Sequence, residues 1–216
     1  MPPKVKICGL KTDAALECAL EHGADFVGLV FYPRSPRYVS PVAAAGLARR
    51  ALGKAKTVAL LVDPDDALLE QIVDVVAPDM IQLHGHESVD RVREVRDRWS
   101  RSVIKAIAVE SAEDVRRAAS FQPAADVLLF DAKPPGGQSN ALPGGNGLPF
   151  DWDLLDVSAV PRPFMLSGGL TVDNVAAAIA TARPDMVDVS SGVERAPGEK
   201  DLVLIRRFLT AAKAKA

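Results

Sequence analysis

Short apolar runs recur along the whole chain, and Ala-rich or charged stretches separate them. Eight of these runs are rich in Val, Ile, Leu and Phe, and they cover residues 5–8, 26–31, 57–62, 80–84, 103–109, 127–131, 164–167 and 186–190. Short apolar runs without strict alternation are typical of strands that are buried on both faces. The pattern therefore predicts eight strands of a parallel sheet covered by helices.

The stretches between these runs have the spacing of amphipathic helices. Predicted helices cover residues 12–22, 65–77, 88–99, 111–121, 171–182 and 201–213, with a short one at 151–157. In residues 88–99, apolar side chains recur every three or four positions, whereas Arg and Glu occupy the other face. The sequence SAED at 111–114 is close to a capping box, which marks a helix start.

Eight strands with helical stretches after them indicate an α/β fold, a single (β/α)₈ TIM barrel over residues 1–216. An open doubly wound sheet shows the same alternation, because closure leaves no trace in the local pattern. No GxGxxG follows the first strand to favour a dinucleotide-binding fold. Residues 133–149, KPPGGQSNALPGGNGLP, interrupt the rhythm. A linker there would leave too little sheet for a second core, so we expect a long functional loop.

Charge and composition narrow the choice of partners. A formal net charge of −2 provides no general attraction to nucleic acid or to an anionic membrane. No apolar run approaches the ~20 residues of a membrane span, and the first residues do not resemble a signal peptide. Cys8 and Cys18 are too few for a disulfide framework, so a cytoplasmic protein is expected.

In a barrel, the active site lies at the C-terminal ends of the strands. Two of these ends are rich in small residues, LSGGL after the seventh run and VSSGVE after the eighth. Small residues let backbone N–H groups approach an anion, and barrel enzymes often bind phosphate at these two loops. Tight turns use the same residues, but two such segments at these places favour a small phosphorylated substrate. The residues concerned are Gly168, Gly169, Ser190, Ser191 and Gly192.

A thiol and a carboxyl group at strand ends are the candidates for acid–base chemistry. Cys8 ends the first run, and Asp131 ends the sixth, where a core residue would be apolar. Strand alternation places Lys6 on the same face as Cys8, so Lys6 is expected to lower the pKa of the thiol and favour a thiolate base. Inert packing is the alternative for Cys8. For Cys18, among the alanines of a helix, packing is the expected role.

Arg37 and His84 are expected to contact the substrate. Arg37 lies in the loop YPRSPRYVS, and a guanidinium there can hold a carboxylate through two parallel hydrogen bonds. Surface charge is the expected role of Arg34 in the same loop. His84 is expected to form a hydrogen bond near the barrel mouth. His86 and Glu87 follow it closely, but no third ligand cluster matches them, so no metal site is predicted.

Taken in order, the motifs resemble the phosphoribosylanthranilate isomerase family of tryptophan biosynthesis. The resemblance covers nearly the full chain and rests on VKICGL, GLVFYPRSPRYVS, QLHG, LLFDAKPPGG, PGGNGLPFDW, LSGGLTVDNV and VDVSSGVERAPGEKD. It implies a TIM barrel and an Amadori rearrangement without cofactor or metal. It also implies that Cys8 is the general base, Asp131 the general acid and Arg37 the partner of the anthranilate carboxylate. Many relatives have threonine in the GG-x-G loop, where this chain has Asn146.

Two other functions fit parts of the sequence. A related barrel isomerase acting on a histidine-pathway aldosylamine needs two phosphate sites and two carboxylates. Here the third loop, LVDPDD, is acidic, and the first catalytic position is Cys8. A regulatory phosphate-binding barrel would keep LSGGL and VSSGVE without needing Cys8 opposite Asp131. Whether the chain is a monomer or a homodimer, and whether it accepts a second aldosylamine, are left open.

Overall fold

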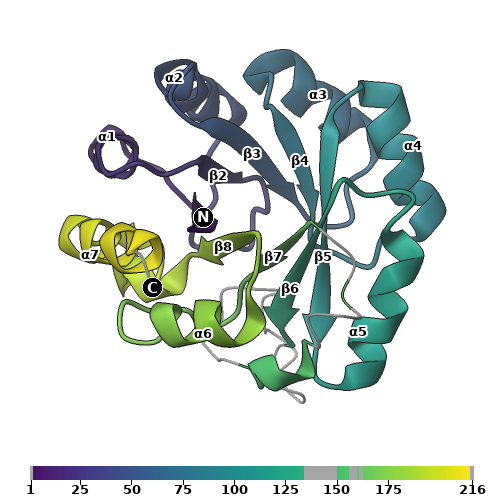
Figure 1. Cartoon of the computed structure of the whole chain (residues 1–216). Coiled ribbons are helices and arrows are strands. Elements are labelled where there is room, and N and C mark those ends of the chain that lie inside the picture. The colour runs from purple at the N-terminus through teal and green to yellow at the C-terminus, as the bar shows by residue number, and fades with distance from the viewer. Residues whose placement is uncertain (1, 134–149, 156–159, 161–162, 215–216) are drawn as a thin grey trace.

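A closed barrel of eight parallel strands forms the centre of the molecule, and helices surround it (Figure 1). The computed structural model describes residues 2–133, 150–155, 160 and 163–214. The barrel strands, in order, are β1 (Lys4–Cys8), β2 (Phe26–Val30), β3 (Lys56–Leu61), β4 (Met80–Leu83), β5 (Ser102–Val109), β6 (Val127–Ala132), β7 (Phe164–Leu166) and β8 (Met186–Val189). All eight predicted strands are therefore present, with boundaries that agree within a few residues.

The helices between the strands follow the predicted alternation, with two differences. They are α1 (Asp13–Glu21), α2 (Pro41–Ala51), α3 (Asp66–Val76), α4 (Val89–Trp99), α5 (Ala112–Ala118), α6 (Val175–Ala182) and α7 (Leu202–Lys213), with 3₁₀ turns η1 (Ala119–Phe121), η2 (Trp152–Leu154) and η3 (Ser191–Val193). Helix α2 lies outside the helical ranges predicted above. The helix predicted at 151–157 is only the short turn η2 in its described part, and residues 156–157 lie outside the described residues.

Side-chain caps explain where several helices begin. The side-chain oxygens of Thr12, Ser40, Asp65 and Ser88 each accept a hydrogen bond from the backbone N–H three residues later, at the starts of α1 to α4. The predicted capping box at Ser111 is present, because Asp114 accepts hydrogen bonds from the Ser111 backbone and hydroxyl. Local sequence signals thus set the starts of these helices before any packing.

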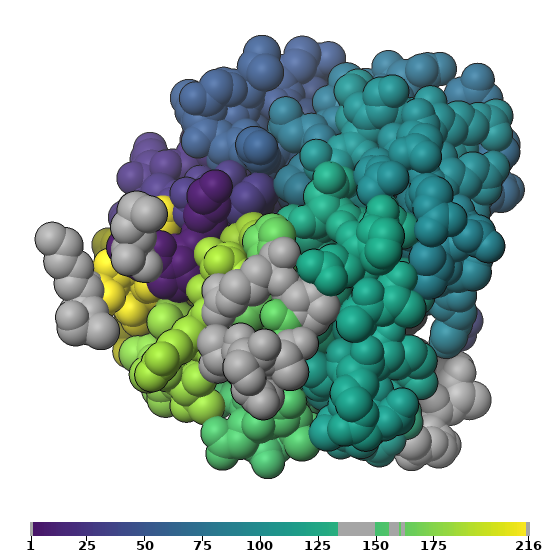
Figure 2. Space-filling model, turned by 45° about the vertical axis from the view of Figure 1, so that its right-hand side comes forward, coloured from purple at the N-terminus to yellow at the C-terminus, as the bar shows by residue number. Residues whose placement is uncertain are grey.

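Closure of the barrel depends on pairing between the first and the last strand. Strand β1 pairs in parallel with β8, with Lys6 opposite Asp188, as well as with β2. The yellow helix α7 also lies beside the purple N-terminal segment in both views (Figures 1 and 2). The prediction of a TIM barrel is confirmed, and the open-sheet alternative is wrong. Within the described residues, no helix has the length and apolarity needed to cross a membrane.

The interior of the barrel changes from apolar to polar toward the C-terminal ends of the strands. Its apolar part is a cluster made by Phe26, Val58, Met80, Ile104, Ala106, Val127, Leu129, Met165 and Met186. Residues two positions further along a strand share the same face, so Gln82 and Asp188 lie one layer above Met80 and Met186. Lys6, Gln82 and Asp188 are buried, and they form the floor of a polar barrel mouth.

A small hairpin follows β8 and was not predicted from the sequence. It consists of β9 (Glu194–Ala196) and β10 (Glu199–Lys200), which pair in antiparallel fashion before α7 begins. The long segment expected to form a functional loop lies, apart from Lys133, outside the described residues. Asn146 lies there as well.

Candidate active site

Cys8 lies at the C-terminal end of β1 and points into the barrel, where only 3% of its surface is exposed. The facing position on β2 is Gly28, and a Cβ atom there would lie 2.8 Å from the Cys8 Sγ and 3.2 Å from the Lys6 Cε. The missing side chain at Gly28 therefore leaves the space that the thiol occupies. The interior placement of Lys6 beside Cys8 agrees with the strand alternation.

The charges around Cys8 do not bring its pKa below the usual value. Burial raises the pKa of the thiol above its usual value of 9.0, and the Lys6 ammonium offsets this only in part. Lys6 is itself held by Asp188, with 3.0 Å between Nζ and Oδ1, and the Asp188 carboxylate raises the pKa of Cys8 further. The expectation of a lowered pKa is wrong, because the sequence pattern reveals the neighbouring cation but neither the burial nor the anion that pairs with it.

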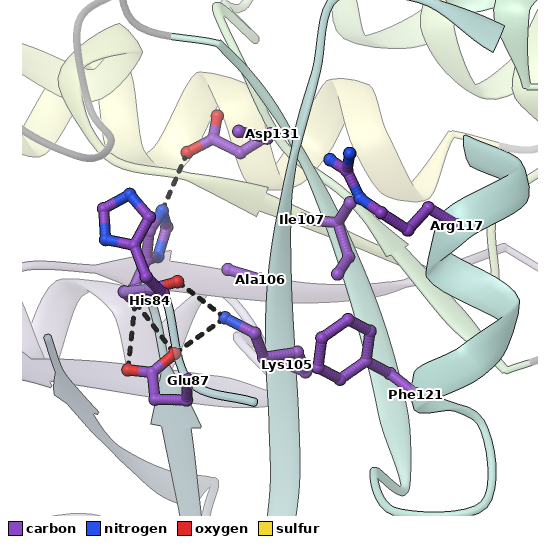
Figure 3. A pocket seen from close by; sticks show the side chains of 11 residues that line it. His84, Glu87, Lys105, Ala106, Ile107, Arg117, Phe121 and Asp131 are labelled. Carbon is purple, nitrogen blue, oxygen red and sulfur yellow. Dashed lines mark hydrogen bonds and ion pairs between the residues drawn. The ribbon is translucent and has the colours of Figure 1, made fainter. Parts of the chain in front are cut away.

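Asp131 is near the end of β6 and is 5% exposed, and each of its carboxyl oxygens has a polar neighbour. Its Oδ1 accepts from the backbone N–H of Ala132 at 2.9 Å, and its Oδ2 lies 3.2 Å from the His84 Nε2 (Figure 3). The Gln82 amide nitrogen lies 2.9 Å from the His84 Nδ1. The two ring nitrogens of His84 face Gln82 and Asp131. His84 thus orients the Asp131 carboxyl group.

A cavity of about 420 Å³ opens beside Asp131 and His84 at the ends of β4 and β5. Figure 3 shows these two side chains on one side of β5, with Arg117 and Phe121 on the other side of this strand. Below His84, the loop after β4 is held by a buried ion pair of Lys105 with Glu87, in which Nζ and Oε2 are 2.7 Å apart.

Glu87 and His86 take different directions from His84. The Glu87 carboxylate also accepts the backbone N–H of Gly85, so it anchors the loop that presents His84. The His86 side chain is 95% exposed and lies 3.4 Å from the Asp63 carboxylate. The three residues that are close in sequence thus do not converge on one point.

The loops after β7 and β8 have backbones that require glycine. Gly168 and Gly169 adopt positive φ angles of 85° and 63°, and a Cβ at Gly168 would lie 2.6 Å from the Ala132 nitrogen. A Cβ at Gly192, within η3, would overlap the Leu170 carbonyl oxygen, so the two loops are in contact. Within the described residues, no oxygen accepts the backbone N–H of Gly168 or Gly169. These loops have the small residues and the donors that an anion requires.

Arg37 is buried against Gly9, the residue after Cys8, and its guanidinium forms a two-bond ion pair. Its Nε and Nη2 donate to the two carboxylate oxygens of Glu194 in β9 at 2.9 and 2.8 Å. Its aliphatic part packs on Gly9, whose Cβ position would be 2.8 Å from the Arg37 Cδ. Lys200 in β10 donates to Glu194 as well, with 2.8 Å between Nζ and Oε1. Arg34, from the same loop as Arg37, is exposed, as expected.

The structure therefore groups Cys8 with Lys6, Arg37 and the loop after β8, and Asp131 with His84 and the loop after β7. Cys18 is half-buried, packs against the core around α1 and takes no part in either group. Gln82, Asp188, Glu194 and Lys200 also belong to these groups and were not predicted from the sequence. The sequence did offer a signal for Glu194 and Lys200: they flank the Pro-Gly pair in VERAPGEK, directly after the candidate phosphate-binding segment VSSGVE.

The fold and these groups define a class: a (β/α)₈ barrel protein with two glycine-containing loops after β7 and β8, and with a thiol and a carboxyl group at its mouth. Residues 5–211 match the family described as N-(5'phosphoribosyl)anthranilate (PRA) isomerase. The chain belongs to this family, as its motifs predicted.

Individual relatives agree with this assignment over nearly their full length. An N-(5'-phosphoribosyl)anthranilate isomerase from Bradyrhizobium sp. (strain BTAi1 / ATCC BAA-1182) is 51% identical over 210 residues, which are 97% of this chain and 95% of the relative. The crystal structure of phosphoribosyl anthranilate isomerase from Thermotoga maritima is 36% identical, covers 98% of both chains and has a TM-score of 0.87.

A further solved structure shows a relative with a ligand. It is a phosphoribosyl anthranilate isomerase in complex with reduced 1-(o-carboxyphenylamino)-1-deoxyribulose 5-phosphate, which is 34% identical to this chain over 98% of both, with a TM-score of 0.84. The comparisons favour this isomerase family over both a histidine-pathway isomerase and a regulatory barrel.

Proposed function

We propose that this chain isomerises N-(5'-phosphoribosyl)anthranilate to 1-(2-carboxyphenylamino)-1-deoxyribulose 5-phosphate, a step of tryptophan biosynthesis. The observation that carries this proposal is the placement of Cys8 and Asp131. Both point into the mouth of the barrel, from the ends of β1 and β6, in a chain that belongs to the isomerase family. Acid and base at these two strands can reach one sugar ring from two sides.

The reaction consists of two proton transfers, one by Asp131 and one by Cys8, and a final tautomerisation, with no net gain or loss of atoms. Asp131 in its protonated form donates to the furanose ring oxygen, the bond from C1 to that oxygen breaks, and a Schiff base forms between C1 and the anthranilate nitrogen. Cys8 as thiolate then removes the proton from C2. The resulting enolamine then tautomerises: the C2 hydroxyl loses its proton as C1 gains one, C2 becomes a carbonyl, and the product is the aminoketose. His84 holds the Asp131 carboxyl group toward the substrate throughout.

The electrostatics of the base follow from its surroundings. Because burial raises the pKa of Cys8, the thiol form dominates at neutral pH, and the thiolate relies on the nearby ammonium groups of Lys6 and Lys200. Among the causes of that pKa, both lysines act to lower it, whereas Asp188 raises it. A base of high pKa binds the C2 proton strongly once it is ionised.

The two anionic ends of the substrate need separate partners. We assign the phosphate to the loops containing Gly168, Gly169, Ser190, Ser191 and Gly192, where positive-φ glycines bring backbone N–H groups to the surface of the mouth. We assign the anthranilate carboxylate to Arg37, whose aliphatic part packs on Gly9 and whose guanidinium is already fixed by Glu194. Arg37 and the phosphate loops are joined by the hairpin that follows β8.

Replacement of the two acid–base groups tests the proposal. Cys8→Ala and Asp131→Asn should each lower kcat by at least ~10²-fold, because general acid–base catalysis typically contributes 10²–10⁴-fold. The assay is the loss of phosphoribosylanthranilate fluorescence with purified protein, and thermal unfolding reports whether the fold is retained. Cys18→Ala is the matched control and should keep the wild-type rate. A folded Cys8→Ala or Asp131→Asn protein with near wild-type kcat would remove that residue from the mechanism.

A further inference from the structure

We infer that Glu194 and Lys200, the ends of the β9–β10 hairpin, are positioning residues for the reaction. Glu194 holds the Arg37 guanidinium in its binding orientation, and Lys200 both fixes Glu194 and places a second ammonium group near Cys8. This inference rests on the proposed function, because it concerns how Arg37 and Cys8 are prepared for the substrate.

Arg37, Glu194 and Lys200 form a buried cluster joined by charge-assisted hydrogen bonds. Glu194 accepts two hydrogen bonds from Arg37 and one from Lys200, all between 2.8 and 2.9 Å. The side chains of Arg37, Glu194 and Lys200 are 7%, 4% and 3% exposed. A two-bond pair of guanidinium and carboxylate fixes the plane of the guanidinium as well as its position.

The hairpin is tied to both sides of the barrel mouth. Lys200 donates to the Ser190 carbonyl at 2.8 Å, and the Ser190 hydroxyl donates to the Cys8 carbonyl at 3.3 Å. The turn at Gly198, where φ is 79°, packs so closely on the Pro36 carbonyl that a side chain there would overlap it. The hairpin therefore connects the end of β1, the loop after β8 and the loop that carries Arg37.

Arg37 needs such support because of its side chain and its location. An arginine has four flexible side-chain torsions, and ordering them only when substrate binds would weaken binding. Gly9 provides a flat surface for its aliphatic part, and Glu194 fixes its end. Without the Glu194 carboxylate, the guanidinium would be buried without its charge partner and would turn away from its present orientation.

The same network sets the charge near the thiol. Groups that face Cys8 are Lys6 from β1, Asp188 from β8 and Lys200 from β10, while Arg37 and Glu194 neutralise each other. Lys6 is already paired with Asp188, so Lys200 supplies the excess positive charge. Burial lowers the pKa of Lys200, and the Glu194 carboxylate offsets this only in part.

Glu194→Gln is the decisive variant, and the hairpin contains its own control. Glu199 pairs with Arg195 across the same hairpin at 3.0 Å, but these side chains are 58% and 71% exposed. Glu199→Gln should therefore leave activity unchanged, whereas Glu194→Gln should lower kcat/KM by roughly 10- to 100-fold, mainly through KM, since charge-assisted hydrogen bonds are strong when buried. Glu194→Asp, which keeps the charge on a shorter side chain, should lose less.

A double-mutant cycle distinguishes positioning from general damage. If Glu194 acts through Arg37, the Arg37→Ala/Glu194→Gln double variant should be no slower than Arg37→Ala alone. A substrate analogue without the carboxylate should respond little to Glu194→Gln. Additive losses, or an equal loss for substrate and analogue, would overturn the inference. If Arg37→Ala itself had no effect, the assigned role of Arg37 in the proposed function would fail instead.

The reactivity of the Cys8 thiol tests the role of Lys200. Both proteins carry Cys18→Ala, so that only Cys8 reacts with iodoacetamide. In Lys200→Met, the alkylation of Cys8 should reach a given rate only at a higher pH than in the protein with Lys200. The alkaline limb of the kcat/KM profile should move in the same direction. An unchanged pH dependence in both measurements would exclude Lys200 from control of the thiol, and thermal unfolding would show whether the variant is folded.

Discussion

Gly28→Ala tests whether the space beside Cys8 is needed for catalysis. The added methyl group would lie 2.8 Å from the Cys8 Sγ, 3.0 Å from the Cys8 Cα and 3.2 Å from the Lys6 Cε. One of these distances involves backbone of the neighbouring strand β1, so the methyl group cannot be accommodated by rotation of the thiol alone. Either the two strands separate slightly or the thiol changes its direction.

The distances give the expected size of both effects. Overpacking of a well-packed interior destabilises by about 1–3 kcal/mol, which would lower the unfolding midpoint without preventing folding. A displacement of a reacting group by about 1 Å can reduce the rate by ~10²-fold. Since the clash requires a shift of several tenths of an ångström, kcat should fall by roughly 10- to 100-fold. KM should change little, because Gly28 is on the floor of the mouth and not in the loops assigned to the two anions.

The assay is steady-state fluorescence kinetics together with urea unfolding. Gly46→Ala is the matched control: this glycine lies within α2, nothing lies within 4 Å of its Cβ position, and the change should stabilise the helix by about 0.5–1 kcal/mol with kcat unchanged. A Gly28→Ala protein with wild-type kcat and stability would refute the tight contact between Gly28 and the thiol. Loss of stability without loss of kcat would show that the direction of the thiol does not depend on this contact.

Three other predictions follow from the same region. Lys6→Met leaves the Asp188 carboxylate buried without its partner and should reduce the free energy of unfolding by about 3–5 kcal/mol in urea titrations. If a Lys6→Met/Asp188→Leu double variant recovered none of this loss, the broken ion pair would not be its cause. Gly169→Asp introduces a carboxylate into the loop assigned to phosphate, so isothermal titration with a product analogue should show much weaker binding, and unchanged affinity would contradict this assignment. The raised pKa of Cys8 predicts a stability loss at alkaline pH. Below pH 9.0 the Cys8 thiol is protonated in both the folded and the unfolded state, but above pH 9.0 it ionises first in the unfolded chain. The wild type should therefore lose stability more steeply with rising pH than Cys8→Ala. Parallel plots of stability against pH for the two proteins would contradict the raised pKa.

Local pattern was sufficient for the eight strands, for most of the helices and for the identity of the family. The eight apolar runs became strands because residues buried on both faces must be apolar throughout, and this requirement is visible in each run separately. The start of α5 followed from the capping box at Ser111, which involves only neighbouring residues. Gly168 was assigned to a candidate phosphate-binding loop from the small residues around it. Its positive φ agrees with the need for glycine at this position.

Long-range contacts decided what the local pattern left open. Closure of the barrel required β1 to pair with β8, and a strand's own sequence is the same in an open and a closed sheet. The pKa of Cys8 rose because burial and Asp188 outweigh Lys6, and only Lys6 was recognisable from strand alternation. Arg37 and Glu194 are 157 positions apart, and each alone reads as an ordinary charged residue. Their pairing exists because closure brings the loop after β2 against the hairpin after β8, and ion-pair partners are chosen by distance in space rather than by position in the chain.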